Sequence, residues 1–284
     1  MQLSIRDVVF ETFQFLRDNR VDLLRMMAAP VLTLAIVGLA VSAMVWSDHP
    51  IKSISDLTPM QITGRILNAV LSTVFYVMFA VAWHRRCLKP EEQTTILSAL
   101  RWDKRKTLFL LRCLAISLIA LALSLPAAVI GAIVGGALAM ALASAGIGGH
   151  AMGAYVTMLA KFAVLIPIVL VQVRLALWLP AAAVDHKMTV MEAWTIGRQN
   201  TWRLVAIFLF SIAPAMVVIF LVASGLTAIA HATGLSGSLT FRFLVGLALN
   251  FIYYIVIAAS VSALSISYRE LRSSVPAWAA FAAR

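Results

Sequence analysis

The chain has 284 residues and a net charge of +11, yet 62% of its residues are hydrophobic and only 12% are charged. Soluble domains are about 45–50% apolar and about 25% charged, so a soluble fold is excluded because it could not cover itself with polar surface. The basic residues lie between long apolar runs, which argues against a nucleic-acid partner. The composition predicts an all-α integral membrane protein, with residues 1–284 forming a single membrane domain.

Residues 1–29 predict an amphipathic helix at the membrane surface. Between Ser4 and Asn19, apolar side chains recur at helical spacing and the acidic side chains fall on another face. The apolar positions are Ile5, Val8, Val9, Phe13 and Leu16. Asp7 follows Ser4 by three residues, which is the spacing of an N-terminal helix cap. Because this polar stretch precedes the first apolar run, we expect no cleavable signal peptide.

Six apolar segments are long enough to cross a bilayer as helices, which takes about 20 residues each. We place them at 30–46, 66–83, 108–143, 155–179, 204–230 and 243–267. Together they predict a six-helix bundle over residues 30–267, followed by a tail at 268–284. Prolines inside several segments predict kinks or helix ends, which membrane helices tolerate where neighbouring groups satisfy the freed carbonyls.

The third segment allows two interpretations, because about 36 residues at about 1.5 Å each exceed a hydrocarbon core of about 30 Å. It is either one long helix kinked at Pro126 or two spans broken there. With six spans, nearly all basic residues lie on one side, and only Lys52, Arg65 and Arg242 lie on the other. The positive-inside rule therefore favours six spans in a bacterial inner (cytoplasmic) membrane, with both termini cytoplasmic.

A basic cluster precedes the third span and predicts contact with anionic phospholipid. It consists of Arg101, Trp102, Lys104, Arg105 and Lys106. Cations near the membrane surface attract anionic lipid by about 1 kcal/mol each, and tryptophan suits the headgroup zone. Topology signalling explains the same cluster. Arg174, inside the fourth span, is a further candidate for a lipid phosphate, with snorkelling or a structural contact as the alternative.

Small side chains repeat at every fourth position of the third span. They are Ala127, Gly131, Gly135, Ala139 and Ala143. Such a face lets another helix approach closely, and the two glycines match the GxxxG pattern. The face packs either within the bundle or against a second copy of the chain in a homodimer.

The sequence offers little for catalysis or ion transport. All acidic residues lie outside the six spans, which disfavours a proton pump because such relays need carboxyl groups at membrane depth. At the expected cytoplasmic surface, Asp185 and His186 are the only adjacent acid and imidazole, and we interpret them as a solvated pair with side chains on different faces. No metal motif, phosphate-binding loop or nucleophile elbow is present. We therefore assign no catalytic residue, no metal and no cofactor.

A weak internal repeat links the amino terminus to the second half of the chain. Residues 4–7 (SIRD) and 189–192 (TVME) both begin a helix that reaches an asparagine, Asn19 or Asn200, and then an apolar span with a proline. A third copy would start near Thr95. Chance similarity between amphipathic helices is the alternative.

Two stretches carry a family resemblance. They are residues 174–185 (RLALWLPAAAVD) and, after Ala193 and Trp194, residues 197–204 (GRQNTWRL). This pattern of span, proline and amphipathic helix resembles the membrane domain of bacterial glycerophosphodiester phosphodiesterases and the YciC-like stand-alone inner-membrane proteins. The phosphodiesterase barrel needs about 200 or more further residues. The resemblance therefore implies a membrane module without the hydrolase, and it carries over no catalytic residue.

These observations favour a non-enzymatic accessory or scaffold protein that associates with anionic lipid, with a partner membrane complex, or with both. A transporter or channel for an anionic or lipid-like solute is the first alternative, with Arg174 and Lys161 on its path. A membrane-embedded lipid enzyme is the weaker alternative.

Overall fold

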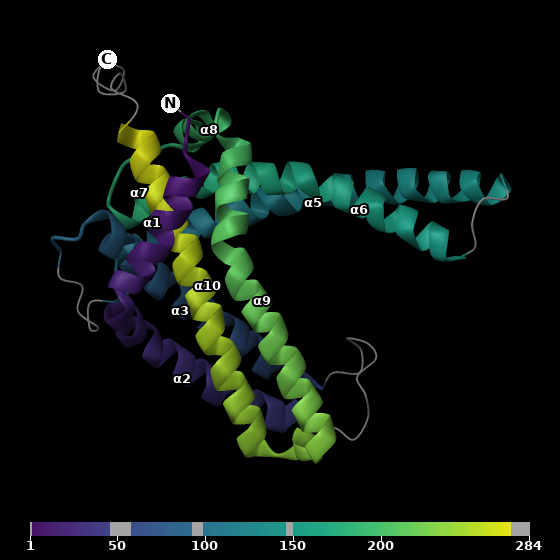
Figure 1. Ribbon diagram of the computed structural model, residues 1–284, viewed down its shortest axis with the longest axis horizontal. Coiled ribbons are helices and arrows are strands. Elements are labelled where there is room, and N and C mark those ends of the chain that lie inside the picture. Colours follow the sequence, from purple (N-terminus) through teal and green to yellow (C-terminus); the bar gives the residue numbers. More distant parts are fainter. Residues whose placement is uncertain (1, 46–57, 93–98, 146–149, 274–284) are drawn as a thin grey trace.

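The computed structural model describes residues 2–45, 58–92, 99–145 and 150–273, and its elements are all helical (Figure 1). The long helices are α2 (Arg20–Val45), α3 (Pro59–Leu88), α5 (Lys104–Ser144), α6 (His150–Ala176), α9 (Thr201–Thr233) and α10 (Leu239–Ser273). The shorter elements are α1 (Ile5–Asp18), α7 (Trp178–Ala183), α8 (Val190–Arg198) and the 3-10 turn η2 (Leu235–Gly237).

Six helical segments in the described part of the chain are long and apolar enough to cross a membrane, which confirms the all-α membrane class. Five are α2, α3, α5, α9 and α10, and the remaining one joins the end of α6 to α7. The long third segment is one helix that continues through Pro126. Only one backbone N–H is lost at a proline, so a membrane helix can bend there without ending.

Helix α10 is the centre of the main body, where it packs against α1, α2, α3 and α9. Small side chains of α10 let α3 approach closely, and polar groups are paired across this contact. The indole of Trp83 donates to the Ser262 hydroxyl at 2.8 Å, and His84 Nδ1 lies 2.7 Å from the Ser265 hydroxyl. Because all four side chains are buried, these bonds remove the cost of unpaired polar groups.

An aromatic cluster fastens this body together. Phe79 stacks on Trp83 at 6.0 Å between ring centroids and meets Tyr254 edge-on at 5.2 Å. Phe15 of α1 contacts the same tryptophan ring edge-on at 5.4 Å. Since edge-to-face pairs contribute about 0.5–1.5 kcal/mol beyond burial, the cluster ties the surface helix α1 to two long helices.

Helices α5 and α6 form a hairpin that projects sideways from the body (Figure 1). Its base contacts α3, α7, α8 and α9, whereas the outer part of α5 packs against α6. The six long helices therefore do not form one uniform bundle. The hairpin leaves many large apolar side chains of α5 exposed, including Leu118, Leu125 and Ile133.

The amino-terminal boundary differs from the sequence-based expectation. Ser4 does cap α1, because its hydroxyl accepts from the Asp7 N–H, which confirms the predicted cap. The amphipathic helix ends at Asp18 rather than near residue 29, and the first long helix already begins at Arg20. Pro30 lies inside that helix instead of starting it.

The apolar face that the sequence predicts for α1 is divided between the body and the surface. Val8 and Thr12 are buried against the body, whereas Phe13 is exposed. The Thr12 hydroxyl donates to the Val8 carbonyl at 2.8 Å, so its polar group is satisfied locally. A threonine can therefore take a core position beside apolar side chains. At the other end, α10 continues to Ser273, so the predicted tail begins as helix.

Candidate functional site

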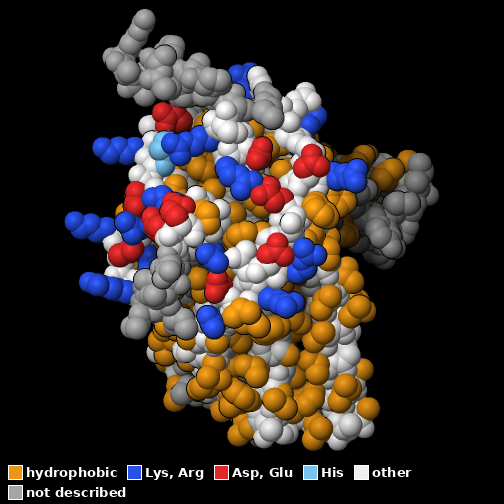
Figure 2. Space-filling view, turned by 60° about the vertical axis from the view of Figure 1, so that its left-hand side comes forward, with side chains coloured by type: hydrophobic (Ala, Val, Ile, Leu, Met, Phe, Trp, Pro, Cys, Tyr) orange, Lys and Arg blue, Asp and Glu red, His pale blue; other side chains and the backbone are white. Residues whose placement is uncertain are grey.

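Charged side chains gather at one end of the molecule, and apolar side chains cover the opposite end (Figure 2). We call this region the charged end. It comprises α1, α7, α8, the last turns of α3 and α10, and the first turns of α5 and α9. Arg269 near the end of α10 binds Glu11 of α1 at 2.6 Å, so the amino-terminal helix and the last described helix lie side by side.

The predicted basic cluster is divided by the fold. Arg101, Trp102 and Lys104 are exposed, and the Trp102 indole donates to the Thr107 hydroxyl at 2.9 Å. Of the other two members, Arg105 stays half-exposed and binds Asp185, and only Lys106 is buried. Lys106 is only 2% exposed and donates to the Arg101 carbonyl. Lipid binding by the exposed residues stays a prediction, while Arg105 and Lys106 have protein partners.

Arg105 joins a network around the end of α7. Its Nε donates to Asp185 at 2.7 Å, and Asp185 also receives Arg85 Nη1 at 3.3 Å. Arg85 donates in addition to the Ala183 carbonyl at 2.9 Å and binds Glu92. Partial desolvation opposes ionisation of Glu92, but hydrogen bonds from Arg85 and Lys89 outweigh it and lower its pKa. These contacts lock α3, α5 and α7 together.

Arg174 occupies an internal corner rather than an open surface. Its guanidinium lies 4.5 Å from the centre of the Trp194 ring, and its Nε donates to the Thr201 hydroxyl. Gly197 is the reason α8 can approach so closely, because a Cβ there would lie 3.3 Å from the Arg174 Cα. The residues that carried the family resemblance thus form one contact between α6, α8 and α9.

Arg112 provides a second link at the same corner. Its Nη1 donates to the Trp178 carbonyl at 2.6 Å, and its guanidinium lies 4.8 Å from the Trp178 ring centre. The indole of Trp178 donates onward to the Met188 carbonyl at 2.7 Å. The cation therefore joins α5 to α7 instead of facing lipid.

The small-residue face of α5 lies partly inside the hairpin. Gly131 and Gly135 are buried, and Ala127 and Ala139 are half-buried. The side chain of Ala143 lies outside what the structure describes. Because α5 packs along α6, close approach within one chain is the arrangement present, and the homodimer stays a prediction.

Asp185 and His186 diverge, as neighbouring positions require, but each has protein partners. Asp185 adopts a positive φ of 60° and binds the two arginines described above. His186 Nδ1 lies 3.0 Å from the Tyr268 hydroxyl. Desolvation, followed by the nearby charges of Arg272 and Arg112, lowers the pKa of His186. The pair is thus part of a contact between α7 and α10, not a simple solvated pair.

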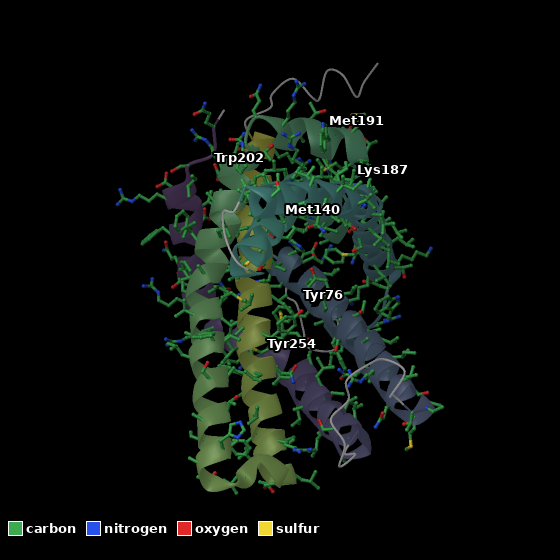
Figure 3. The ribbon with its side chains drawn as sticks, turned by 90° about the vertical axis from the view of Figure 1, so that its right-hand side faces the viewer. Tyr76, Met140, Lys187, Met191, Trp202 and Tyr254 are labelled. Carbon is green, nitrogen blue, oxygen red and sulfur yellow. The ribbon has the colours of Figure 1, made fainter. Side chains whose placement is uncertain are left out.

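Large apolar side chains are exposed among these charges. Phe10 on α1 is 69% exposed, Met191 on α8 is 71% exposed and Trp202 at the start of α9 is 65% exposed. Figure 3 shows Met191, Trp202 and Lys187 at this end of the molecule. Such a mixture of exposed apolar and basic side chains is typical of surfaces that meet lipid headgroups.

Helix α1 carries the clearest example of that mixture. Arg6, Phe10, Phe13 and Arg17 recur at spacings of four, three and four residues, and all four are exposed. This spacing places them in one stripe, which faces away from the buried Val8. We call these four residues the outer stripe of α1. The sequence predicts an apolar face at the membrane surface that includes Phe13, but it does not group Phe13 with Phe10 and the two arginines.

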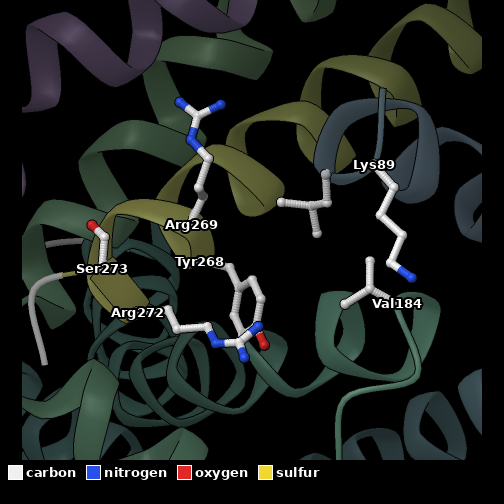
Figure 4. A pocket seen from close by; sticks show the side chains of 7 residues that line it. Lys89, Val184, Tyr268, Arg269, Arg272 and Ser273 are labelled. Atoms are coloured by element: carbon white, nitrogen blue, oxygen red, sulfur yellow. The ribbon is translucent and has the colours of Figure 1, made fainter. Parts of the chain in front are cut away.

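A cationic pocket lies between the end of α3, the loop after α7 and the end of α10. Its volume is about 400 Å³, and it is lined by Leu88, Lys89, Val184, Tyr268, Arg269, Arg272 and Ser273. Figure 4 shows Lys89 and Arg272 reaching in from different helices, with the Tyr268 ring beside Arg272. Lys89 and the two arginines of α10 are far apart in the sequence, so the sequence does not predict that they share a pocket.

The amino-terminal segment is tethered beside this region. The Leu3 N–H donates to the Asn200 side chain at 2.9 Å, and Arg203 donates to the Leu3 carbonyl. A second hollow of about 220 Å³ lies next to α1 and is lined by Asp7, Glu11 and Glu270 among others. Within the ranges described, no group of three His, Cys, Asp or Glu side chains is placed to hold a metal ion.

Comparison with known protein families, curated proteins and solved structures returns no match. The resemblance to the phosphodiesterase membrane domain therefore stays a prediction. The six long apolar helices of the described residues make the chain a multi-pass membrane protein.

Proposed function

We propose that this protein is a non-enzymatic accessory or scaffold protein of the bacterial inner membrane that associates with anionic phospholipid at its cytoplasmic side. The outer stripe of α1 is the single observation that carries the proposal. It presents two phenylalanines between two arginines on a helix that is already fastened to the body. Apolar insertion and attraction to anionic headgroups act together on such a surface.

The rest of the charged end supports the same function. Met191 on α8 and Trp202 on α9 repeat the combination of an exposed apolar side chain beside basic residues. Lys187 and Arg198 are exposed near them in the sequence. A protein that only needed its basic residues for topology would not require large apolar side chains to remain exposed on its surface helices.

Quenching by brominated lipids tests this proposal directly. Cys87 and Cys113 are replaced by alanine, and a fluorophore is attached to Phe10→Cys in nanodiscs of phosphatidylcholine with or without phosphatidylglycerol. We expect brominated phosphatidylglycerol to quench the label more strongly than brominated phosphatidylcholine does. The matched control is Asp18→Cys, which is exposed on the acidic side of the same helix, about 80° around its axis from Phe10. Equal quenching at both positions by both lipids would contradict the proposal.

The charge component has its own variant. Arg6→Gln with Arg17→Gln removes both cations of the outer stripe and leaves the phenylalanines in place. Because each cation contributes about 1 kcal/mol near an anionic surface, the preference for phosphatidylglycerol at Phe10→Cys should fall clearly. High salt should produce the same loss, since exposed charges are screened over about 8 Å at physiological ionic strength.

The proposed orientation is tested by accessibility to a membrane-impermeant thiol reagent in intact cells. Ser238→Cys, between α9 and α10, should react from outside, whereas Ser4→Cys should not. If Ser4→Cys reacts from outside, the amino terminus is not cytoplasmic and the proposed orientation is wrong.

The transporter alternative placed Arg174 on a solute path. The contacts of Arg174 with Trp194 and Thr201 give it a structural role instead. The side chain of Lys161 lies outside the described residues. We therefore favour the lipid-associated accessory role.

A further inference from the structure

We propose that the cationic pocket between α3, α7 and α10 binds a phosphate group, carried by an anionic phospholipid or by a soluble phosphate ester. The inference deepens the proposed function, on which its lipid arm rests, by naming the site and the chemical group it takes. The pocket is separate from the outer stripe of α1, so the two surfaces can be tested apart.

The charge of the lining is the first argument. Lys89, Arg269 and Arg272 line the pocket, and none of the seven lining residues is acidic. Among the described residues, no carboxylate forms an ion pair with Arg272. Arg269 does bind Glu11 and Glu270, but both contacts use the same terminal nitrogen, Nη2. Lys89 Nζ also binds Glu92 at 3.3 Å, so Arg272 is the lining cation whose charge no described carboxylate balances, and an anion in the pocket would balance it.

The hydrogen-bonding groups fit a phosphate. Guanidinium groups donate to phosphate oxygens in fixed, forked geometry, and an ammonium acts as a compact point charge. The Tyr268 hydroxyl is held in place by His186 at 3.0 Å and also contacts Arg272. The Ser273 hydroxyl lies at the same rim and is available to exchange its bond to the Glu270 carbonyl.

The shape and position of the pocket agree with this ligand class. A volume of about 400 Å³ lies in the range of about 300–1,000 Å³ that is usual for small-ligand sites. Leu88 and Val184 supply an apolar wall beside the cations. A phosphate that continues into a glycerol backbone or another partly apolar group would contact both kinds of surface.

Two probes separate the two sources of phosphate. In the lipid arm, wild-type protein in mild detergent is mixed with dioleoyl phosphatidylglycerol, and retained lipid is counted by native mass spectrometry. In the soluble arm, protein in phosphatidylcholine nanodiscs is titrated with glycerol 3-phosphate by calorimetry. Binding in the first arm alone assigns a lipid headgroup, and binding in the second arm assigns a soluble ester.

The test variant is Lys89→Gln with Arg272→Gln, and the charge-matched control is Arg25→Gln with Arg65→Gln, two exposed cations outside the pocket. The test variant should weaken binding about 30-fold in the arm that shows binding, which corresponds to about 1 kcal/mol for each cation. The control should bind like wild type. A second variant, Ser273→Asp, adds a negative charge at the exposed rim without removing a cation and should also abolish most binding.

Equal binding by wild type, test variant and Ser273→Asp in both arms would overturn the pocket, as would no binding in either arm. Failure of the proposed function looks different. If Phe10→Cys shows no preference for phosphatidylglycerol while glycerol 3-phosphate still binds through Lys89 and Arg272, the pocket stands and the lipid-associated role falls.

Discussion

The main body and the α5–α6 hairpin are held together by different kinds of contact. In the body, α3 and α10 meet through large aromatic rings and paired polar groups, as at Trp83 and Ser262. In the hairpin, α5 buries glycines along α6 and exposes most of its large apolar side chains. In a membrane, lipid tails compete equally for apolar surface, so specific polar bonds and close packing are what distinguish one neighbour from another.

The corner around Arg174 and Arg112 connects these two regions. Arg112 ties α5 to α7, and Arg174 ties α6 to α8 and α9. The base of the hairpin is therefore fixed to the body by cations, while its outer part depends on α5 and α6 alone. The comparison predicts that variants of equal chemistry will have unequal effects in the two regions.

The largest effect is expected in the body, at Trp83. Replacing this fully buried residue by alanine removes its stacking on Phe79 and leaves the Ser262 hydroxyl without the indole donor. The free energy of unfolding should fall by about 3–5 kcal/mol, measured by thermal denaturation in detergent. The control Trp202→Ala removes an exposed tryptophan and should change the melting temperature little. Similar losses in both variants would show that the aromatic cluster does not organise the body.

The hairpin is tested next by Gly131→Leu with Gly135→Leu. Both positions are buried, so leucine should force α5 away from its neighbour at about 1–3 kcal/mol for each site. Gly136→Leu is the matched control, because a Cβ there meets nothing within 4 Å. Size-exclusion chromatography with light scattering distinguishes the partner. A loss of folded yield without a change in assembly size indicates packing on α6, and conversion of a dimer to a folded monomer indicates a homodimer face.

The contact between α6, α8 and α9 should be weakened by Gly197→Val, which lowers the stability of the protein. A side chain at this position meets the Arg174 backbone at 3.3 Å, so α8 must move and the stacking of Arg174 on Trp194 weakens. We expect a loss of about 1–3 kcal/mol by thermal denaturation. Gly225→Val in α9 has open space around its Cβ and controls for the helix propensity of valine. If Gly197→Val and Gly225→Val have the same melting temperature, the close approach at Gly197 does not contribute to stability.

The smallest effect is a pH dependence at His186. Its lowered pKa means that the unfolded state takes up a proton more readily than the folded state. The contribution of neutral His186 to stability is therefore present above about pH 6.5, the ordinary histidine pKa, and is lost as the pH falls through the lower folded value. The melting temperature should fall less between pH 7.5 and pH 5 in His186→Gln than in wild type. An unchanged pH dependence would remove this residue from the contact between α7 and α10.

Much of the architecture follows from local properties of the sequence. The long apolar segments require helices because a membrane leaves no other partner for the backbone, and the continuity of α5 through Pro126 agrees with the charge distribution. The residues that cap α1 and α8 can also be predicted from their neighbours in the sequence. Ser4 accepts from the Asp7 N–H, and Thr189 forms a complete capping box with Glu192. These matching caps favour the proposed repeat, whose third copy begins outside the described residues.

The sequence alone determined that this chain is an α-helical membrane protein with charged surface helices, because hydropathy, helical period and capping depend on neighbours within a few turns. Only the tertiary structure decided which cations face the surface. Arg112 and Arg174 lie inside predicted spans and bind a carbonyl, aromatic rings or a hydroxyl from other helices. Lys89 and Arg272 are far apart in the sequence and share a pocket because α3 and α10 end side by side. Such pairings depend on long-range packing, which no local pattern records.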